Sequence, residues 1–448
     1  MTVTVREVAL NVLEKIEKQG AYSQLALNHA IEKAALSEKD VALLTQIVYG
    51  TLQRQLTLDY YIRTFVKNEK KMEPWVRLLL RLSFFQFTFL DKVPDHAIVS
   101  EAVTIAKKRG HKGIAGLVNG VLRATQRKGL PNLEGIKDPI ERLSIETSHP
   151  QWLLKRWLSY YGIEATRTMC DYNNTAPLTT LRVNALKMSR DEALAALLET
   201  GLDAEKGRLS DDALILNKGK ILSHPLYKEG KVTIQDESSM LVNVALAPQP
   251  MMRILDACAG PGGKTTHIAE KMADEGDIIA LDIHQHKTKL IEKSAARLDL
   301  RSIHTHALDA RSVQEAFEPA SFDCILVDAP CTGFGVIRRK PEIKYQKTVK
   351  DIEQIAEIQT KILAAVAPLL KKGGKLVYST CTVDKEENVG TAERFLQEFT
   401  DFEVDHALMD RLPQTLQNHS RWYGKGMVQI LPQDFDTDGF FISCFVKK

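Results

Sequence analysis

The sequence is poor in cysteine, and the cysteines it has are scattered. Six occur in 448 residues, and no two of them stand in a CxxC pair. Such an arrangement gives no indication of a disulfide framework or of a structural zinc site. The pattern therefore predicts no bound metal and a reducing, cytoplasmic environment in which single thiols stay available for chemistry.

Long apolar runs are also absent. No stretch reaches the ~18 consecutive apolar residues that a membrane-spanning helix needs. The N-terminus, MTVTVREVALNVLEKIEKQG, has no basic segment leading into an apolar one, so it does not have the pattern of a signal peptide. We therefore expect no membrane partner.

An excess of either charge is missing as well. The formal net charge is only +3, so the total does not indicate a nucleic-acid partner, which must be argued from local clusters. Charged residues make up 26% and hydrophobic residues 44% of the chain, as in an ordinary globular protein.

Three kinds of hydrophobic pattern follow one another along the chain. Residues 1–130 show helical periodicity throughout, with a helix start predicted at 37–40 and a buried central helix over 75–90. Prolines and a glycine interrupt the pattern over 131–150, which we interpret as a linker. Residues 151–235 mix helices with short alternating strands, which predicts a small α+β lobe. From 236 to 448, strands alternate with helices, which predicts a Rossmann-like α/β domain with a mostly parallel sheet.

A glycine-rich segment joins the first strand of the α/β domain to its helix. It reads LDACAGPGGKTT over 255–266. A phosphate-binding Walker A loop would need glycine where Cys258 stands, and a dinucleotide-binding GxGxxG would need glycine at Thr265. The remaining interpretation is an S-adenosylmethionine loop, because that ligand carries a sulfonium cation and a ribose instead of phosphates.

Aspartates end four successive strands of this domain. They are Asp256, Asp282, Asp309 and Asp328. Carboxylates at the carboxyl edge of a parallel sheet can accept hydrogen bonds from ribose hydroxyls, as the predicted cofactor requires. Each one could instead serve only as a helix cap or a turn former.

Two cysteines also follow strand ends, Cys331 in DAPC and Cys381 in STC. Carbon 5 of cytosine is too weak a nucleophile to attack a methyl sulfonium until a thiolate adds at C6. A carboxyl group near N3 assists the addition, and a further group must help to release the thiol. Cys381, Cys331 and Asp328 can fill these roles, and the spacing alone allows either thiol to be the nucleophile. Cys170, Cys324 and Cys444 lie in apolar or helical contexts that favour buried packing.

The motifs over 236–448 resemble the RNA cytosine-C5 methyltransferase family (Nop2/Sun/RsmB). The segments that carry the resemblance, in the family's order, are QDESS (235–239), DACAGPGGKT (256–265), DAPC (328–331), GVIRRKPE (335–342), STC (379–381), EEN (386–388) and DGFF (438–441). The resemblance implies that Cys381 is the nucleophile and that Cys331 assists release. DNA cytosine methyltransferases use the PC cysteine instead, which is the alternative assignment.

The resemblance also implies the cofactor contacts. The expected contacts to S-adenosylmethionine are Cys258, Ala259, Gly260, Pro261, Gly262, Gly263, Lys264, Asp282, Asp309 and Asp328. Many family members have alanine where this chain has Gly260, a small change that should not harm binding.

Residues 1–130 resemble the NusB-type helical RNA-binding domain, through REVALNVLEKI, LSEKDVALLTQIVYGTLQR and VNGVLR. This extension is typical of the bacterial family members that methylate one cytosine of 16S rRNA, conventionally cytosine 967. The implied partner is 16S rRNA, naked or in an early small-subunit particle, and we expect a monomer. The alternative is a non-catalytic RNA-binding or antitermination factor, which would have no need of Asp328, Cys331 and Cys381.

Basic residues cluster at two places that could meet RNA phosphates. The expected RNA contacts are Lys107, Lys108, Arg109, Lys112, Arg123, Arg127 and Lys128 in the helical domain, and Arg338 and Arg339 after the DAPC loop. The first cluster could also be only a solvated helix face. A base that reaches the site must leave its stack.

Overall fold

The computed structural model describes residues 3–34, 36–67 and 71–448. It separates into two compact units, residues 1–176 with 337–346, and residues 177–336 with 347–448. No helix among the described residues has the length and apolarity to cross a membrane. The chain passes between the two units three times, because the ten residues 337–346 belong to the first.

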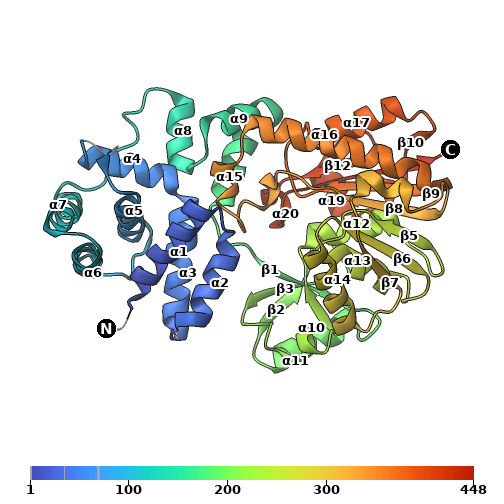
Figure 1. Cartoon of the computed structure of the whole chain (residues 1–448), viewed down its shortest axis with the longest axis horizontal. Helices are drawn as coiled ribbons and strands as arrows, with labels where there is room; N and C mark the ends of the chain where they lie inside the picture. Colours follow the sequence, from blue (N-terminus) through green and yellow to red (C-terminus); the bar gives the residue numbers. More distant parts are fainter. Residues whose placement is uncertain (1–2, 35, 68–70) are drawn as a thin grey trace. The chain divides into compact units, whose positions relative to one another are not determined.

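The first unit is helical (Figure 1). Its helices are α1 (Val5–Gln19), α2 (Ser23–Ala34), α3 (Glu38–Gln53), α4 (Gln55–Phe65), α5 (Pro74–Phe89), α6 (Asp95–Arg109), α7 (Lys112–Lys128), α8 (Pro139–Thr147), α9 (Gln151–Asn173) and α15 (Ile343–Gln346). The predicted start at 37–40 is confirmed, because the Ser37 side chain accepts a hydrogen bond from the Asp40 backbone N–H.

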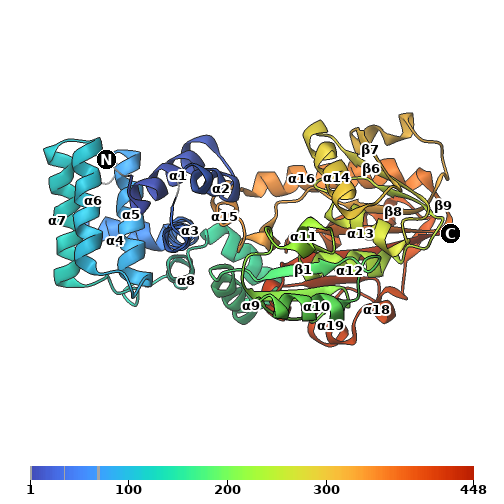
Figure 2. The same ribbon diagram turned by 90° about the horizontal axis from the view of Figure 1, so that it is seen from below.

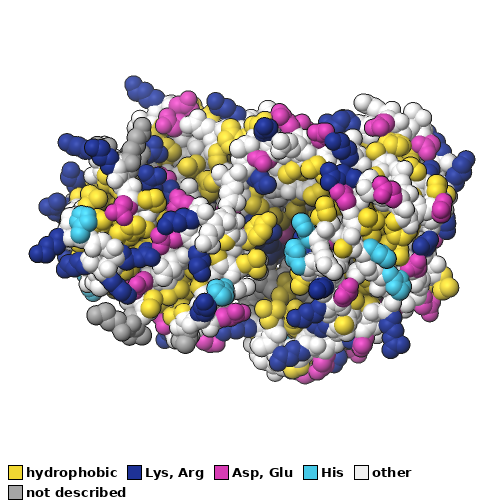
Figure 3. Space-filling model, in the orientation of Figure 1, with side chains coloured by type: hydrophobic (Ala, Val, Ile, Leu, Met, Phe, Trp, Pro, Cys, Tyr) yellow, Lys and Arg dark blue, Asp and Glu magenta, His cyan; other side chains and the backbone are white. Residues whose placement is uncertain are grey.

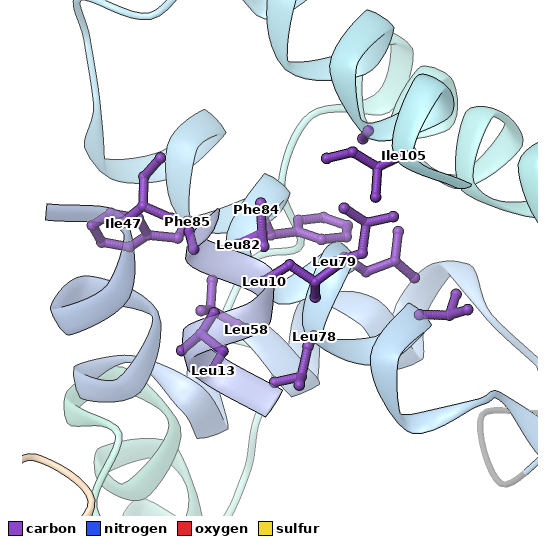
Figure 4. Packing of buried hydrophobic residues seen from close by; sticks show 14 of the residues in the cluster. Leu10, Leu13, Ile47, Leu58, Leu78, Leu79, Leu82, Phe84, Phe85 and Ile105 are labelled. Atoms are coloured by element: carbon purple, nitrogen blue, oxygen red, sulfur yellow. The ribbon is translucent and has the colours of Figure 1, made fainter. Parts of the chain in front are cut away.

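Helix α5 is central to the core of this unit, as its apolar sequence predicts. Figure 4 shows its side chains, Phe84 and Phe85 among them, packed with leucines and isoleucines of neighbouring helices. Gly50 of α3 permits a close approach, since an added Cβ would lie 1.9 Å from the Phe85 ring. Figure 2 shows α6 and α7 side by side in the same unit.

The predicted linker 131–150 differs from the structure, because it contains α8. Asp138 caps this helix by accepting from two backbone N–H groups, and Pro139 occupies its first turn. Proline at that position starts a helix, since its missing N–H would have no helical partner anyway. The sequence pattern predicts a helix over 151–161. In the structure, Gly162 interrupts α9 with a positive φ just after this point, and helical structure then resumes and continues to Asn173.

The second unit begins with the small α+β lobe. Its elements are β1 (Thr179–Val183), α10 (Arg190–Glu199), β2 (Asp203–Lys206), β3 (Ala213–Lys218), α11 (Pro225–Lys228) and β4 (Val232–Ile234). The strands form an antiparallel sheet in the order β2-β3-β1-β4. The sequence pattern predicts β1, α10, β3 and β4 but not β2, a short strand at the sheet edge.

The remainder of the second unit is a doubly wound α/β domain. Its strands are β5 (Arg253–Asp256), β6 (Asp277–Asp282), β7 (Ile303–Ala307), β8 (Phe322–Asp328), β9 (Leu370–Thr380), β10 (Phe402–Val404), β11 (Arg421–Trp422), β12 (Met427–Ile430) and β13 (Phe440–Lys447). The main path runs β11-β12-β13-β9-β8-β5-β6-β7, parallel from β7 to β9, while β10 pairs with β13.

Helices cover both faces of this sheet (Figure 1). They are α12 (Glu237–Leu246), α13 (Gly263–Lys271), α14 (Gln285–Leu298), η2 (Ala310–Glu315), η3 (Phe334–Val336), α16 (Val349–Val366), η4 (Ala367–Leu369), α17 (Val389–Glu398), α18 (Leu408–Arg411), α19 (Gln414–His419) and α20 (Pro432–Phe435). Successive residues of a strand point to opposite faces of the sheet. Leu376 therefore packs in the hydrophobic core that includes α16, and Val377 packs in the core that includes α12. The strand order reverses between β5 and β8, where parallel sheets bind ligands at the carboxyl ends of their strands.

Candidate active site

The glycine-rich segment 257–262 forms the turn between β5 and α13. Gly262 has φ +104°, a conformation that favours glycine. At Gly260 an added Cβ would lie 2.3 Å from the Asp282 carboxylate, so the turn backbone lies directly against this side chain. Asp282 accepts hydrogen bonds from the His284 N–H at 2.8 Å and from Lys287 Nζ at 3.3 Å. A backbone turn next to carboxylates fits a cationic, ribose-bearing ligand better than a polyphosphate.

The four strand-end aspartates have different surroundings. Asp256 is buried and accepts from the Thr265 hydroxyl at 2.7 Å, and burial together with nearby Asp328 raises its pKa to about 7. Asp309 caps η2 through the Arg311 N–H and forms an ion pair with the Arg311 guanidinium, whose hydrogen bonds lower the Asp309 pKa. Asp309 therefore acts as a helix cap here, and its contact with a cofactor stays a prediction.

Lys264 links the glycine-rich turn to the end of β8. Its Nζ lies 2.7 Å from Asp328 Oδ2, and the other oxygen of Asp328 accepts from the Ser379 hydroxyl at 2.8 Å. Burial acts to lower the pKa of Lys264, but the Asp328 carboxylate holds this pKa above its ordinary value. The Lys264 ammonium also lies 5.1 Å from the Phe440 ring centre, which adds a cation–π contact.

The two strand-end cysteines meet. Parallel strands β8 and β9 lie side by side with Asp328 opposite Ser379, so the loops that follow them begin at the same level. Cys331 Sγ and Cys381 Sγ lie 3.3 Å apart. The hydrogen bond with Cys381, followed by burial, raises the pKa of Cys331 well above its ordinary value. Cys331 therefore keeps its proton at neutral pH. Cys170, Cys324 and Cys444 are buried, in agreement with their predicted packing role.

Arg182 of β1 was not singled out from the sequence. Its guanidinium is fully buried and donates to the Gly263 carbonyl at 2.6 Å, to the Thr266 hydroxyl at 3.1 Å and to Glu270 at 2.6 Å. It also donates to the side-chain carbonyl of Gln235, the first residue of the QDESS motif. The small lobe thus fixes the first turn of α13 and with it the glycine-rich turn.

The basic cluster of the helical unit is divided between partnered and exposed residues. Figure 3 shows Lys and Arg side chains gathered over the part of this face formed by α6 and α7. Lys108 forms an ion pair with Glu7, and Arg109 forms one with Glu14, both at 2.8 Å. Lys107, Lys112, Arg123, Arg127 and Lys128 are exposed on the same two helices.

Arg338 does not have the exposed position expected of an RNA contact. Its side chain is 3% exposed, stacks on Tyr172 at 4.4 Å from the ring centre and donates to the Ala176 carbonyl at 2.7 Å. The prediction is wrong for this residue because its guanidinium is used inside the helical unit. Arg339 is half-buried, and its contact with RNA stays a prediction.

Comparisons with known proteins identify the family. Residues 243–446 match the model described as 16S rRNA methyltransferase RsmB/F, residues 3–127 match the NusB family, and residues 149–222 match the ferredoxin-like domain of RsmF/B-like methyltransferases. A Bacillus subtilis protein named probable ribosomal RNA small subunit methyltransferase B is 51% identical over 99% of both chains. The chain belongs to the RsmB/F family of 16S rRNA methyltransferases.

A more distant relative and two solved structures are also similar to the chain. Ribosomal RNA small subunit methyltransferase B of Proteus mirabilis is 34% identical over 99% of both chains. The crystal structure of the protein PH0851 covers all of this chain and 98% of its own, with 26% identity and a TM-score of 0.83. A methyltransferase homologue from Pyrococcus horikoshii covers 70% of this chain at 26% identity and a TM-score of 0.59. The predicted combination of helical, small α+β and Rossmann-like domains is confirmed.

Among the residues that the structure describes, no cluster of three or more His, Cys, Asp or Glu side chains could hold a metal ion. The roles predicted for individual residues in catalysis, cofactor binding and RNA binding stay predictions, apart from the correction at Arg338.

Proposed function

We propose that this RsmB/F family member methylates carbon 5 of one cytosine in 16S rRNA, the base conventionally numbered 967, with S-adenosylmethionine as the methyl donor. The observation that carries the proposal is the pair of thiols, Cys331 and Cys381, 3.3 Å apart beside the Lys264–Asp328 ion pair. A nucleophile, a releasing group and a carboxyl group are the set that C5 methylation of a cytosine requires.

The cofactor would supply a methyl group from its sulfonium, and the bond between sulfur and the methyl carbon would break, so that the cofactor leaves as a neutral thioether. The residues that would hold it are the turn Cys258–Lys264 and the carboxylates Asp282, Asp309 and Asp328. The close packing of Gly260 against Asp282 supports this assignment, since the turn leaves no side chain between its backbone and the carboxylate.

The division of labour between the thiols is the one that the family resemblance implies, and the raised pKa of Cys331 agrees with it, because a thiol that keeps its proton is a poor nucleophile. Cys381 adds to C6 of the cytosine, which makes C5 able to form the new carbon–carbon bond. A base then takes the proton from C5, the electrons of that C–H bond form the C5–C6 double bond, and the bond from C6 to Cys381 breaks. Cys331 assists the breaking of this bond between C6 and Cys381, as the family resemblance implies.

The substrate is 16S rRNA, naked or in an early small-subunit particle, met in the cytoplasm by a monomer. We assign RNA contacts to Lys107, Lys108, Arg109, Lys112, Arg123, Arg127, Lys128 and Arg339. A non-catalytic RNA-binding or antitermination factor is the second candidate, and bisulfite sequencing of rRNA from cells lacking and regaining this protein discriminates between the two. Loss and return of one methylated cytosine supports the enzyme.

The thiol assignment is tested with labelled RNA, S-adenosylmethionine and two variants on one denaturing gel. Cys331→Ala should accumulate a covalent protein–RNA complex, because the adduct forms but its release stalls. Cys381→Ala should show none, because no adduct forms. A trapped complex in Cys381→Ala and none in Cys331→Ala would reverse the two roles, as in the DNA enzymes.

A further inference from the structure

The residues that follow the two cysteines meet at one buried side chain, Glu387. The Thr332 N–H donates to Glu387 Oε2 at 2.8 Å, and the Thr332 hydroxyl donates to Oε1. The Thr382 hydroxyl lies 3.3 Å from the same Oε1 and 3.0 Å from the Thr332 hydroxyl. One carboxylate therefore holds the loop after β8 and the loop after β9 together.

A second layer fixes Glu387 itself. Gln359 of α16 donates to the Pro330 carbonyl at 2.9 Å and to Glu387 Oε2 at 3.4 Å. The Tyr378 hydroxyl donates to the backbone carbonyl of Glu387. These side chains are buried, and Glu387 is fully buried, so it contacts neither solvent nor a substrate that enters from solvent.

We propose that Glu387 is a positioning residue that sets the separation of the Cys331 and Cys381 sulfurs. The inference rests on the proposed function, because it gives those two thiols their task. Glu387 acts one residue away from each of them, through Thr332 and Thr382. It is distinct from the residues assigned to the reaction, since its carboxylate is fully buried and accepts hydrogen bonds from Thr332, Thr382 and Gln359.

A carboxylate suits this place because its oxygens only accept hydrogen bonds. The donors around it are the Thr332 N–H, the Thr332 and Thr382 hydroxyls and the Gln359 amide. A glutamine can replace it if its carbonyl faces the Thr332 N–H and its amide faces the hydroxyls, which can turn to accept. An alanine leaves these buried donors without an acceptor and the loops without a connection.

Disulfide formation between Cys331 and Cys381 measures the separation directly and needs neither RNA nor S-adenosylmethionine. The full-length protein is treated with the oxidant diamide, which takes up the two electrons and two protons that the thiols release. The peptide that joins the two cysteines is then followed by mass spectrometry over time. Glu387→Ala should form this disulfide roughly tenfold more slowly, because the rate depends on how closely the two groups are held.

Matched variants separate positioning from general damage. Glu387→Gln should retain most of the rate, and Glu393→Ala, an exposed glutamate on α17, should equal the unaltered protein. If Glu387→Ala does not fold, Thr332→Val takes its place in the test. Valine is similar in size to threonine but lacks the hydroxyl, so this variant should slow disulfide formation by a smaller factor. A folded Glu387→Ala or Thr332→Val protein that forms the disulfide at the unaltered rate overturns the proposal.

Methylation assays give the second readout. Glu387→Ala should lose roughly 100-fold in kcat, the effect of about 1 Å of misplacement, with unchanged KM for RNA and for S-adenosylmethionine. A slowed disulfide in a protein that never methylates cytosine would reject the proposed function and keep the positioning role. An unaltered kcat with unaltered disulfide formation would reject the positioning role and keep the function.

Discussion

Two carboxyl groups of the α/β domain, Asp256 and Glu387, are buried well enough to alter how the stability of the protein responds to pH. Burial raises the pKa of each to about 7, with the Asp328 charge contributing at Asp256 and the Asp384 charge at Glu387. A carboxyl group whose pKa is raised by folding binds its proton more tightly in the folded state. Its contribution to stability is therefore full at low pH and is lost as the pH rises toward 7.

We expect Glu387→Gln to become more stable relative to the unaltered protein as the pH rises from 5 to 8. The amide never ionises, so the variant escapes the loss that the buried carboxylate suffers, which amounts to roughly 3 kcal/mol for a shift of this size. Urea unfolding of both proteins at the two pH values measures the difference. The same difference at both pH values would mean that Glu387 titrates normally in the folded protein.

At the scale of elements, the basic residues of α6 and α7 differ in whether they form ion pairs within the helical unit. Lys108 and Arg109 at the end of α6 are already paired with Glu7 and Glu14 of α1. Lys112, Arg123, Arg127 and Lys128 of α7 are exposed. Only charges that are free to replace counterions on phosphates contribute to the salt dependence of binding.

We expect replacement of these four α7 residues by glutamine to weaken RNA binding and flatten its salt dependence. The slope of log K against log salt should fall by about 0.7 for each contact with single-stranded RNA that is lost. Lys108→Gln with Arg109→Gln is the comparison and should change the slope less for each charge removed, because these two residues are already in ion pairs. Equal slopes for the α7 variant and the unaltered protein would assign α7 to a solvated face.

Local sequence patterns predicted most helices and strands. They failed where contacts between distant residues determine the environment of a side chain. The strand ends at Asp328 and Cys381 follow from apolar runs, and the parallel sheet brings them together. The linker prediction was wrong at Pro139 because proline was interpreted as a helix breaker when it begins α8. Glu387 lies in a noted motif, but its partners come from two loops 50 residues apart, which no periodicity reveals.

Arg338 shows that predictions from a local charge pattern have the same limit. A run of basic residues beside a catalytic motif indicates a phosphate contact when it is read alone. The stacking on Tyr172 and the bond to Ala176 depend on a return of the chain into the helical unit more than 160 residues later, which the sequence does not indicate.

At the scale of the whole molecule, the returning segment 337–346 completes the helical unit. Lys344 is fully buried and donates to the Gln53 carbonyl at 2.8 Å and to Asn174 at 3.1 Å, and burial holds its pKa well below the ordinary value. Glu342 accepts from the Ser23 N–H at 3.0 Å. The Tyr345 hydroxyl bonds with Ser148. The segment thus satisfies polar groups that belong to residues 1–176.

We therefore expect a fragment of residues 1–176 to unfold at lower urea concentration than the same fragment with 337–346 attached. A short glycine–serine linker is enough to join residue 176 to residue 337, because the Arg338 side chain donates to the Ala176 carbonyl at 2.7 Å. Circular dichroism during urea titration measures both midpoints. Coincident midpoints would show that the segment adds nothing to the stability of the helical unit.

The returning segment also fixes an order of events during synthesis. The ribosome makes residues 1–176 first and must then add the 160 residues from 177 to 336 before the segment appears. At about 5–20 residues per second, this interval is roughly 8–32 s. During that time the nascent helical unit lacks the contacts that Glu342, Lys344 and Tyr345 make in the finished protein. The helical unit, although its first residues are translated first, is thus completed only after the small lobe and about half of the α/β domain have been synthesised.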